Sequence, residues 1–136
     1  MEDGPRTAAP VADAPCAAAE WVLVVDDNDD LRQLVGLSVE ELTGLEVRTA
    51  ADGMQAVAHM LHGTPALIVT DLMMPHMDGW QLFELVRRDH PSLPVIAMSA
   101  AESRGGAVQA GFDGFLTKPF ELEELGAALA RWLTVR

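Results

Sequence analysis

Four short apolar runs of this chain each lead into residues whose side chains can bind a metal ion, act as a nucleophile or donate a hydrogen bond. The runs are "WVLVV", "ALIVT", "VIAM" and "GFLT", and the residues that follow them are Asp26 and Asp27, Asp71, Ser99 and Lys118. Three carboxylates, a hydroxyl and an ammonium form a set suited to phosphoryl transfer. Asp71 would attack phosphorus in line, while Lys118 and Ser99 would stabilise the phosphoryl oxygens. This interpretation requires all five side chains to reach one site.

The carboxylates would repel one another in such a site. Like charges a few ångströms apart raise each other's pKa, and Lys118 supplies one positive charge against three negative ones. A hard cation that prefers oxygen ligands is therefore expected. Because few protein ligands are available and water would complete the coordination, Mg²⁺ fits better than Ca²⁺, with Mn²⁺ as an alternative.

The elements that must position these residues follow from the hydrophobic pattern. Apolar runs predict strands over 21–25, 45–50, 66–70, 95–99 and 114–117. Helical spacing predicts helices over 28–42, 54–61, 80–89, 104–110 and 121–133. Alternating strands and helices predict an α/β fold, with a parallel sheet and helices on both faces. Ligands of such sheets gather at the carboxyl ends of the strands, where the candidate residues stand.

Composition excludes several classes of protein. The chain has 136 residues, 49% of them hydrophobic, with 9 basic and 21 acidic residues and a net charge of −12. That charge disfavours direct binding to nucleic acid. No apolar run approaches the roughly 20 residues of a membrane span, and no signal peptide is apparent, so a cytoplasmic location is expected. Residues 1–20 predict a disordered leader containing the single cysteine, Cys16, and residues 21–136 predict one domain.

Four motifs in this order resemble the receiver domain of two-component response regulators. They are "VLVVDD", "IVTDLMMPHMDG", "VIAMSA" and "FLTKPF". The resemblance implies a flavodoxin-like doubly wound sheet of order 2-1-3-4-5. It also implies that a histidine kinase or phosphotransfer protein phosphorylates Asp71, which then switches a protein-binding face. Asp27, Asp71 and the main-chain carbonyl of Met73 would bind Mg²⁺, and Asp26 would act mainly through water. Phe115 would move inward as Ser99 closes on the phosphoryl group, and the Lys118–Pro119 bond would be cis.

The chain departs from the family pattern in two places. Ser99 and Lys118 are 19 positions apart, about one helical turn fewer than is usual, so the fourth helix should be short. Gly105 and Gly106 also weaken its start. Met73 and Ala101 occupy positions where many relatives place polar side chains that orient the hydrolytic water. Slow self-dephosphorylation is therefore expected.

Two other classes of protein share this architecture but fit the motifs less well. Aspartate-nucleophile phosphatases usually carry an acid two residues after the nucleophile, where this chain has Met73. Nucleotide and flavin binders place glycines after the first strand, where this chain has "DDNDD". The chain could also be the receiver end of a hybrid kinase. A free-standing protein without a DNA-binding output is the favoured expectation.

Several conspicuous residues have structural explanations. Asp29 and Asp30 suit a solvated helix start, and Asp78 suits a turn or helix cap. The methionines of the "MMPHM" segment suit packing. The four histidines lack ligand spacing and are expected at the surface, and the pattern leaves open whether Trp80 and Trp132 belong to the core or to a partner surface.

Overall fold

The computed structural model describes residues 21–135, so the predicted leader and Cys16 lie outside the described residues. Strands and helices alternate along this part of the chain. The elements are β1 (Trp21–Val25), α1 (Asp29–Thr43), β2 (Glu46–Ala50), α2 (Gly53–Met60), β3 (Leu67–Asp71), α3 (Gly79–Asp89), β4 (Val95–Ser99), the 3-10 turn η2 (Ala101–Ser103), α4 (Arg104–Ala110), β5 (Gly114–Thr117) and α5 (Leu122–Ala130). The seven-residue α4 confirms the expected short fourth helix.

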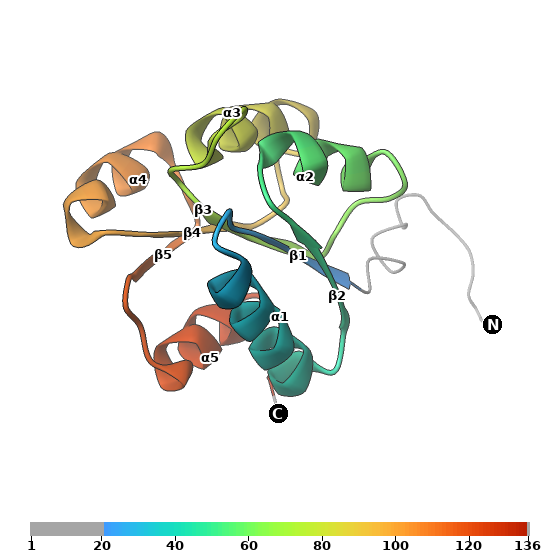
Figure 1. Ribbon diagram of the computed structural model, residues 1–136, viewed down its shortest axis with the longest axis vertical. Coiled ribbons are helices and arrows are strands. Elements are labelled where there is room, and N and C mark those ends of the chain that lie inside the picture. The colour runs from blue at the N-terminus through green and yellow to red at the C-terminus, as the bar shows by residue number, and fades with distance from the viewer. Residues whose placement is uncertain (1–20, 136) are drawn as a thin grey trace.

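The strands form one parallel sheet in the order β2-β1-β3-β4-β5, which confirms the predicted doubly wound fold. The register pairs Val22 of β1 with Leu67 of β3, and Ile68 of β3 with Val95 of β4. Helices α1 and α5 cover one face of the sheet, and α2, α3 and α4 cover the other (Figure 1). Because β1 and β3 are neighbours, the residues that follow them meet at one edge of the sheet.

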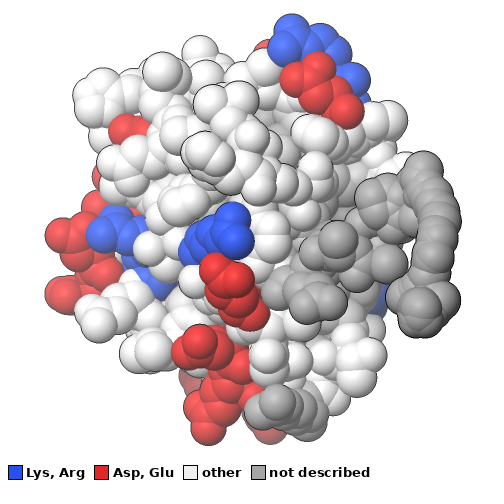
Figure 2. Space-filling model, turned by 90° about the vertical axis from the view of Figure 1, so that its right-hand side faces the viewer, with Lys and Arg blue, Asp and Glu red and all other residues white. Residues whose placement is uncertain are grey.

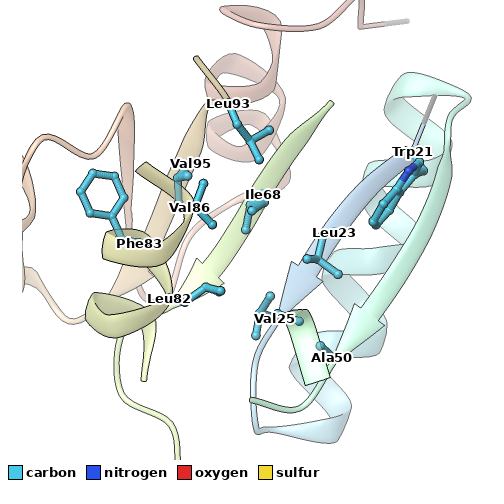
Figure 3. Close-up of a cluster of buried hydrophobic side chains, with 11 residues drawn as sticks. Trp21, Leu23, Val25, Ala50, Ile68, Leu82, Phe83, Val86, Leu93 and Val95 are labelled. Atoms are coloured by element: carbon cyan, nitrogen blue, oxygen red, sulfur yellow. The ribbon is translucent and has the colours of Figure 1, made fainter. Parts of the chain in front are cut away.

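Each face of the sheet has its own apolar core. Successive strand residues point to opposite faces, so alternate residues of one strand enter different cores. Leu23 and Ile68 belong to the cluster on the side of α2 and α3, together with Leu82 and Val86 (Figure 3). Val24 and Val69 pack on the other side, beneath α1 and α5. The buried strands are therefore apolar along their length and carry polar side chains only at their ends.

Two leucines that fit the apolar spacing of the predicted helices are exposed. Leu34 of α1 is 61% exposed and Leu122 of α5 is 56% exposed. The buried stripe of α1 runs through Val35, and Leu34 lies about 100° around the helix from it. Helix α5 ends three residues before its predicted end. The N–H of Trp132 bonds to the carbonyl of Leu129, which tightens the last turn.

The surface reflects the acidic composition. Figure 2 looks at the β2 edge of the sheet and shows acidic side chains gathered along the lower part of this face. Such a surface favours basic partners over phosphate backbones. Within residues 21–135, no helix combines the length and the apolar character needed to cross a membrane.

Candidate functional site

The turn from β1 into α1 places two adjacent aspartates at the carboxyl edge of the sheet. Asp26 is fully buried, and its Oδ1 accepts a hydrogen bond of 2.9 Å from the N–H of Asn28. The side chain of Asn28 caps α1 by accepting from the N–H of Leu31 at 2.9 Å. Asp27, between them, is exposed. The helix cap thus fixes the backbone that carries both carboxylates.

Arg32, which is not among the predicted site residues, also holds this turn. Its Nη1 donates to the main-chain carbonyl of Asp26 at 2.9 Å, and its Nη2 donates to Asp29 Oδ1 at 2.6 Å. Asp29, expected to be only a solvated helix start, therefore also orients this arginine. An arginine four residues after a capping Asn faces back toward the loop, and this spacing is the signal that could have identified it.

Asp71 ends β3 and is buried at the centre of the same edge. Its Oδ1 accepts hydrogen bonds from the N–H groups of Leu72 at 2.7 Å and Met73 at 3.4 Å. The loop that follows folds back tightly, since the N–H of Gly79 donates to the carbonyl of Leu72 at 3.0 Å. A Cβ at Gly79 would collide with the carbonyl oxygen of Asp71 and lie 2.8 Å from the Cα of Leu72. Only glycine fits at this position.

Lys118 reaches the two buried carboxylates from β5. Its Nζ donates to Asp71 Oδ2 at 3.0 Å and to Asp26 Oδ2 at 3.1 Å. Its backbone N–H donates to the carbonyl of Ser99 at 2.8 Å, and the Lys118–Pro119 peptide bond is cis. These contacts bring together residues from β1, β3, β4 and β5 that are up to 92 positions apart in the chain.

The three aspartates form one cluster. Carboxylate oxygens of Asp26, Asp27 and Asp71 all lie within 4.8 Å of one another. One ammonium, that of Lys118, faces this set. The negative charge of the cluster therefore exceeds its positive charge, and the oxygens converge as the ligands of a hard cation do.

Burial shapes the ionisation of the cluster. It raises the pKa of the Asp26 carboxyl, and the charge of Asp71 acts in the same direction, while hydrogen bonds from Asn28 and Lys118 only partly oppose the shift. Burial alone would lower the pKa of the Lys118 ammonium, but hydrogen bonds to Asp71 and Asp26 reverse this and raise it. Because the folded pKa of Asp26 exceeds its unfolded value, its charge destabilises the fold above the folded pKa. That cost disappears as the pH falls toward the unfolded value of 3.8.

The other predicted site residues lie around this cluster. Ser99 is buried at the end of β4, and Phe115 is half-buried on β5. Met73 is 66% exposed beside Asp71, so it does not pack as expected for the "MMPHM" segment, whereas Met74 and Met77 contact the core. Met73 is exposed because it lies in the turn directly after Asp71, outside both cores. Ala101 is exposed in η2.

A tether connects the loop after Asp71 to α2. His76 Nδ1 lies 2.9 Å from Asp52 Oδ2, and the N–H of Gly53 donates to the carbonyl of Met77 at 2.9 Å. His76 is exposed, as predicted, but it has a partner and a left-handed backbone with φ of 67°. Asp78 caps α3 by accepting from Gln81, in agreement with its predicted structural role. The pairing of Asp52 with His76 has no local signal in the sequence.

Comparisons with known proteins agree with this geometry. Residues 22–130 match the family model of the response regulator receiver domain. The chain is 36% identical to the response regulator Rre1 of Synechocystis over 117 residues, which cover 82% of this chain and 51% of Rre1. It is 33% identical to the DNA-binding dual master transcriptional regulator RpaA of Synechocystis, covering 76% of this chain and 45% of RpaA. The chain thus spans about half the length of these relatives.

A solved structure shows the same similarity in three dimensions. The receiver domain of NtrX from Brucella abortus superposes with a TM-score of 0.73 at 36% identity, covering 82% of this chain and 97% of that domain. The sheet order, the acidic cluster at its carboxyl edge and the family match over most of the chain lead to one conclusion. This chain belongs to the family of response regulator receiver domains.

Proposed function

We propose that Asp71 accepts a phosphoryl group from a phosphohistidine of a histidine kinase or phosphotransfer protein. The observation that carries the proposal is the pairing of a buried carboxylate with Lys118 at 3.0 Å, at the open end of the sheet. Asp71 Oδ1 accepts from the N–H groups of Leu72 and Met73, and we assign the attack to Oδ2 because the Lys118 ammonium beside it can also bind the incoming phosphoryl oxygens. This makes the domain a phosphorylated signalling module that does not turn over other substrates.

The transfer forms one bond and breaks one. Asp71 Oδ2 attacks phosphorus, the bond from phosphorus to the histidine nitrogen breaks, and that nitrogen keeps the electron pair. Lys118 Nζ donates to the transferred oxygens and offsets their charge, and Ser99 Oγ donates to another of them as the group settles. The chain supplies positioning and charge, which carry most of the rate in phosphoryl transfer.

The donor set fits Mg²⁺, with Mn²⁺ as an alternative. Three carboxylates converge within 4.8 Å against a single ammonium, a charge imbalance that a divalent cation removes. Asp27, Asp71 and the main-chain carbonyl of Met73 would hold the ion, and Asp26 would act through water. When bound, the ion neutralises negative charge on the carboxylates and on the phosphoryl oxygens.

Phosphorylation by a small donor tests the proposal. Acetyl phosphate with Mg²⁺ is expected to add one phosphoryl group to the wild-type protein and none to Asp71→Asn, because an amide cannot act as the nucleophile. Intact-mass spectrometry measures the addition. Asp78→Asn is the matched control, since Asp78 only caps α3 and its replacement keeps a capping oxygen. Equal addition to the wild type and Asp71→Asn would refute the proposal.

The aspartyl phosphate is expected to hydrolyse slowly. Neither Met73 nor Ala101 can orient an attacking water by hydrogen bonding. Met73→Asn is expected to shorten the phosphoryl half-life by about tenfold or more, because positioning a nucleophile has effects of this size. Loss of the phosphorylated mass over time, after the donor is removed, gives the half-life. A wild-type half-life of seconds would contradict the expectation.

We infer that the output passes through protein contacts of this domain. The net charge of −12 disfavours contact with a phosphate backbone, so we assign any contact with DNA to a partner or to another domain. RpaA, named as DNA-binding, is about twice as long as the matched region. Capture of target proteins with and without acetyl phosphate would identify the partner that reads the phosphorylated state.

A further inference from the structure

The first residue of α4 makes an unusual contact with β5. The guanidinium carbon of Arg104 lies 5.0 Å from the centroid of the Phe115 ring, within the range of a cation–π interaction. Its Nη2 also donates to Thr117 Oγ1 at 3.3 Å. Within residues 21–135, Arg104 forms no salt bridge, so an aromatic ring and a hydroxyl are its partners there.

This contact covers Phe115, the side chain expected to move inward when Asp71 is phosphorylated. The register pairs Ala97 with Phe115 and Ser99 with Thr117. Since side chains two residues apart share one face of a strand, all four point toward the side of α4. The Phe115 ring packs on an inner cluster that includes the small residues Ala97 and Ala107, while Arg104 lies on its outer, solvent side.

The start of α4 is also lightly packed. A Cβ at Gly105 would meet nothing within 4 Å, and the only close neighbour of a Cβ at Gly106 is the Trp80 ring, at 3.3 Å. Two consecutive glycines cost helix stability and leave the first turn easier to displace. Arg104 therefore joins a movable helix end to the β5 strand.

We propose that Arg104 is a positioning residue that holds Phe115 in its half-buried place while the domain is unphosphorylated. The inference rests on the proposed function of Asp71. When Ser99 closes on the phosphoryl group, the space beside Ala97 becomes available to the ring, and the ring leaves the guanidinium. An interaction present in only one of two states shifts their equilibrium toward that state. Arg104 thus sets how readily phosphorylation switches the domain.

Binding of a phosphoryl analogue tests this role. Beryllium fluoride with Mg²⁺ mimics an aspartyl phosphate and can be titrated against the wild type, Arg104→Ala, Asp71→Asn and Arg88→Ala. Arg88 is the matched control, an exposed arginine whose partner is its neighbour Asp89. Proteins labelled with 4-fluorophenylalanine allow fluorine NMR to follow Phe115, with its resonance assigned from Phe115→Leu.

Arg104→Ala is expected to bind the analogue about three- to tenfold more tightly, with Mg²⁺ affinity unchanged. Its Phe115 resonance should already be shifted toward the bound position before the analogue is added. Simple loss of a positive charge would weaken binding of an anion, so tighter binding distinguishes the two effects. Thr117→Val, which removes only the hydroxyl partner, should give a smaller change in the same direction.

Two outcomes overturn the inference separately. If analogue binding depends on Asp71 but Arg104→Ala binds like Arg88→Ala or more weakly, the role of Arg104 is refuted and the proposed function stands. If Asp71→Asn binds the analogue as tightly as the wild type does, the proposed function fails and the inference fails with it.

Discussion

Replacing Gly79 by alanine is expected to destabilise the domain by about 3 kcal/mol or more. The added Cβ would collide with the carbonyl oxygen of Asp71 and lie 2.8 Å from the Cα of Leu72. Both obstacles are backbone atoms of β3 and its turn, so no flexible side chain can move aside. Relief would require the end of β3 to shift, which would also displace the Asp71 carboxylate.

Urea denaturation measures this free energy of unfolding. Gly105→Ala is the control, because its Cβ would meet nothing within 4 Å and alanine favours a helix. That variant should be stabilised by up to about 1 kcal/mol. The two changes are chemically identical and should have opposite signs. A Gly79→Ala protein that unfolds at the wild-type urea concentration would show that the tight turn after Asp71 is not required.

Asp26→Asn is expected to change stability and Mg²⁺ affinity in opposite directions. Burial raises the pKa of Asp26, so its charge is held in the fold at a cost that an amide avoids. Without Mg²⁺ the variant should therefore be more stable, by about 1 kcal/mol. Because a carboxylate that orients bound water is lost, Mg²⁺ affinity should fall by about 10- to 100-fold.

Denaturation in a chelator and calorimetric titration with Mg²⁺ separate the two effects. Saturating Mg²⁺ stabilises the form that binds it, by about 2.7 kcal/mol at a hundredfold excess over Kd, so the order of stability should reverse when Mg²⁺ is added. Asp30→Asn removes the same charge from an exposed position of α1 and should alter neither quantity appreciably. If Asp26→Asn is less stable than the wild type in chelator, the buried charge of Asp26 does not destabilise the fold.

The sequence predicted the fold well where burial is continuous. β1 and β4 are buried at every residue and match their predicted ranges, and the equally buried β3 begins and ends one residue later than predicted, since the strand runs on through Asp71. Helix ends and faces were less predictable. Leu34 fits a helical apolar spacing, yet it faces solvent because Val35 occupies the centre of the buried stripe.

The candidate site was predictable where its residues follow strands directly. Parallel strands bring their carboxyl ends to one edge, so Asp26, Asp71 and Lys118 could be expected together. Contacts that depend on side-chain reach could not be inferred in this way. Asp52 meets His76 across 24 positions, and Arg104 contacts Phe115 from the far end of α4, and neither pairing has a period or spacing that marks it.

The exposed edge of the sheet at β2 carries its own protection against self-association. Glu46 and Arg48 form an ion pair on this strand at 2.9 Å, and the Arg48 guanidinium lies over the Trp21 ring at 4.1 Å. Charged side chains along an unpaired strand oppose edge-to-edge addition of a second molecule. We therefore expect the charges on β2 to disfavour pairing of two sheets along this edge.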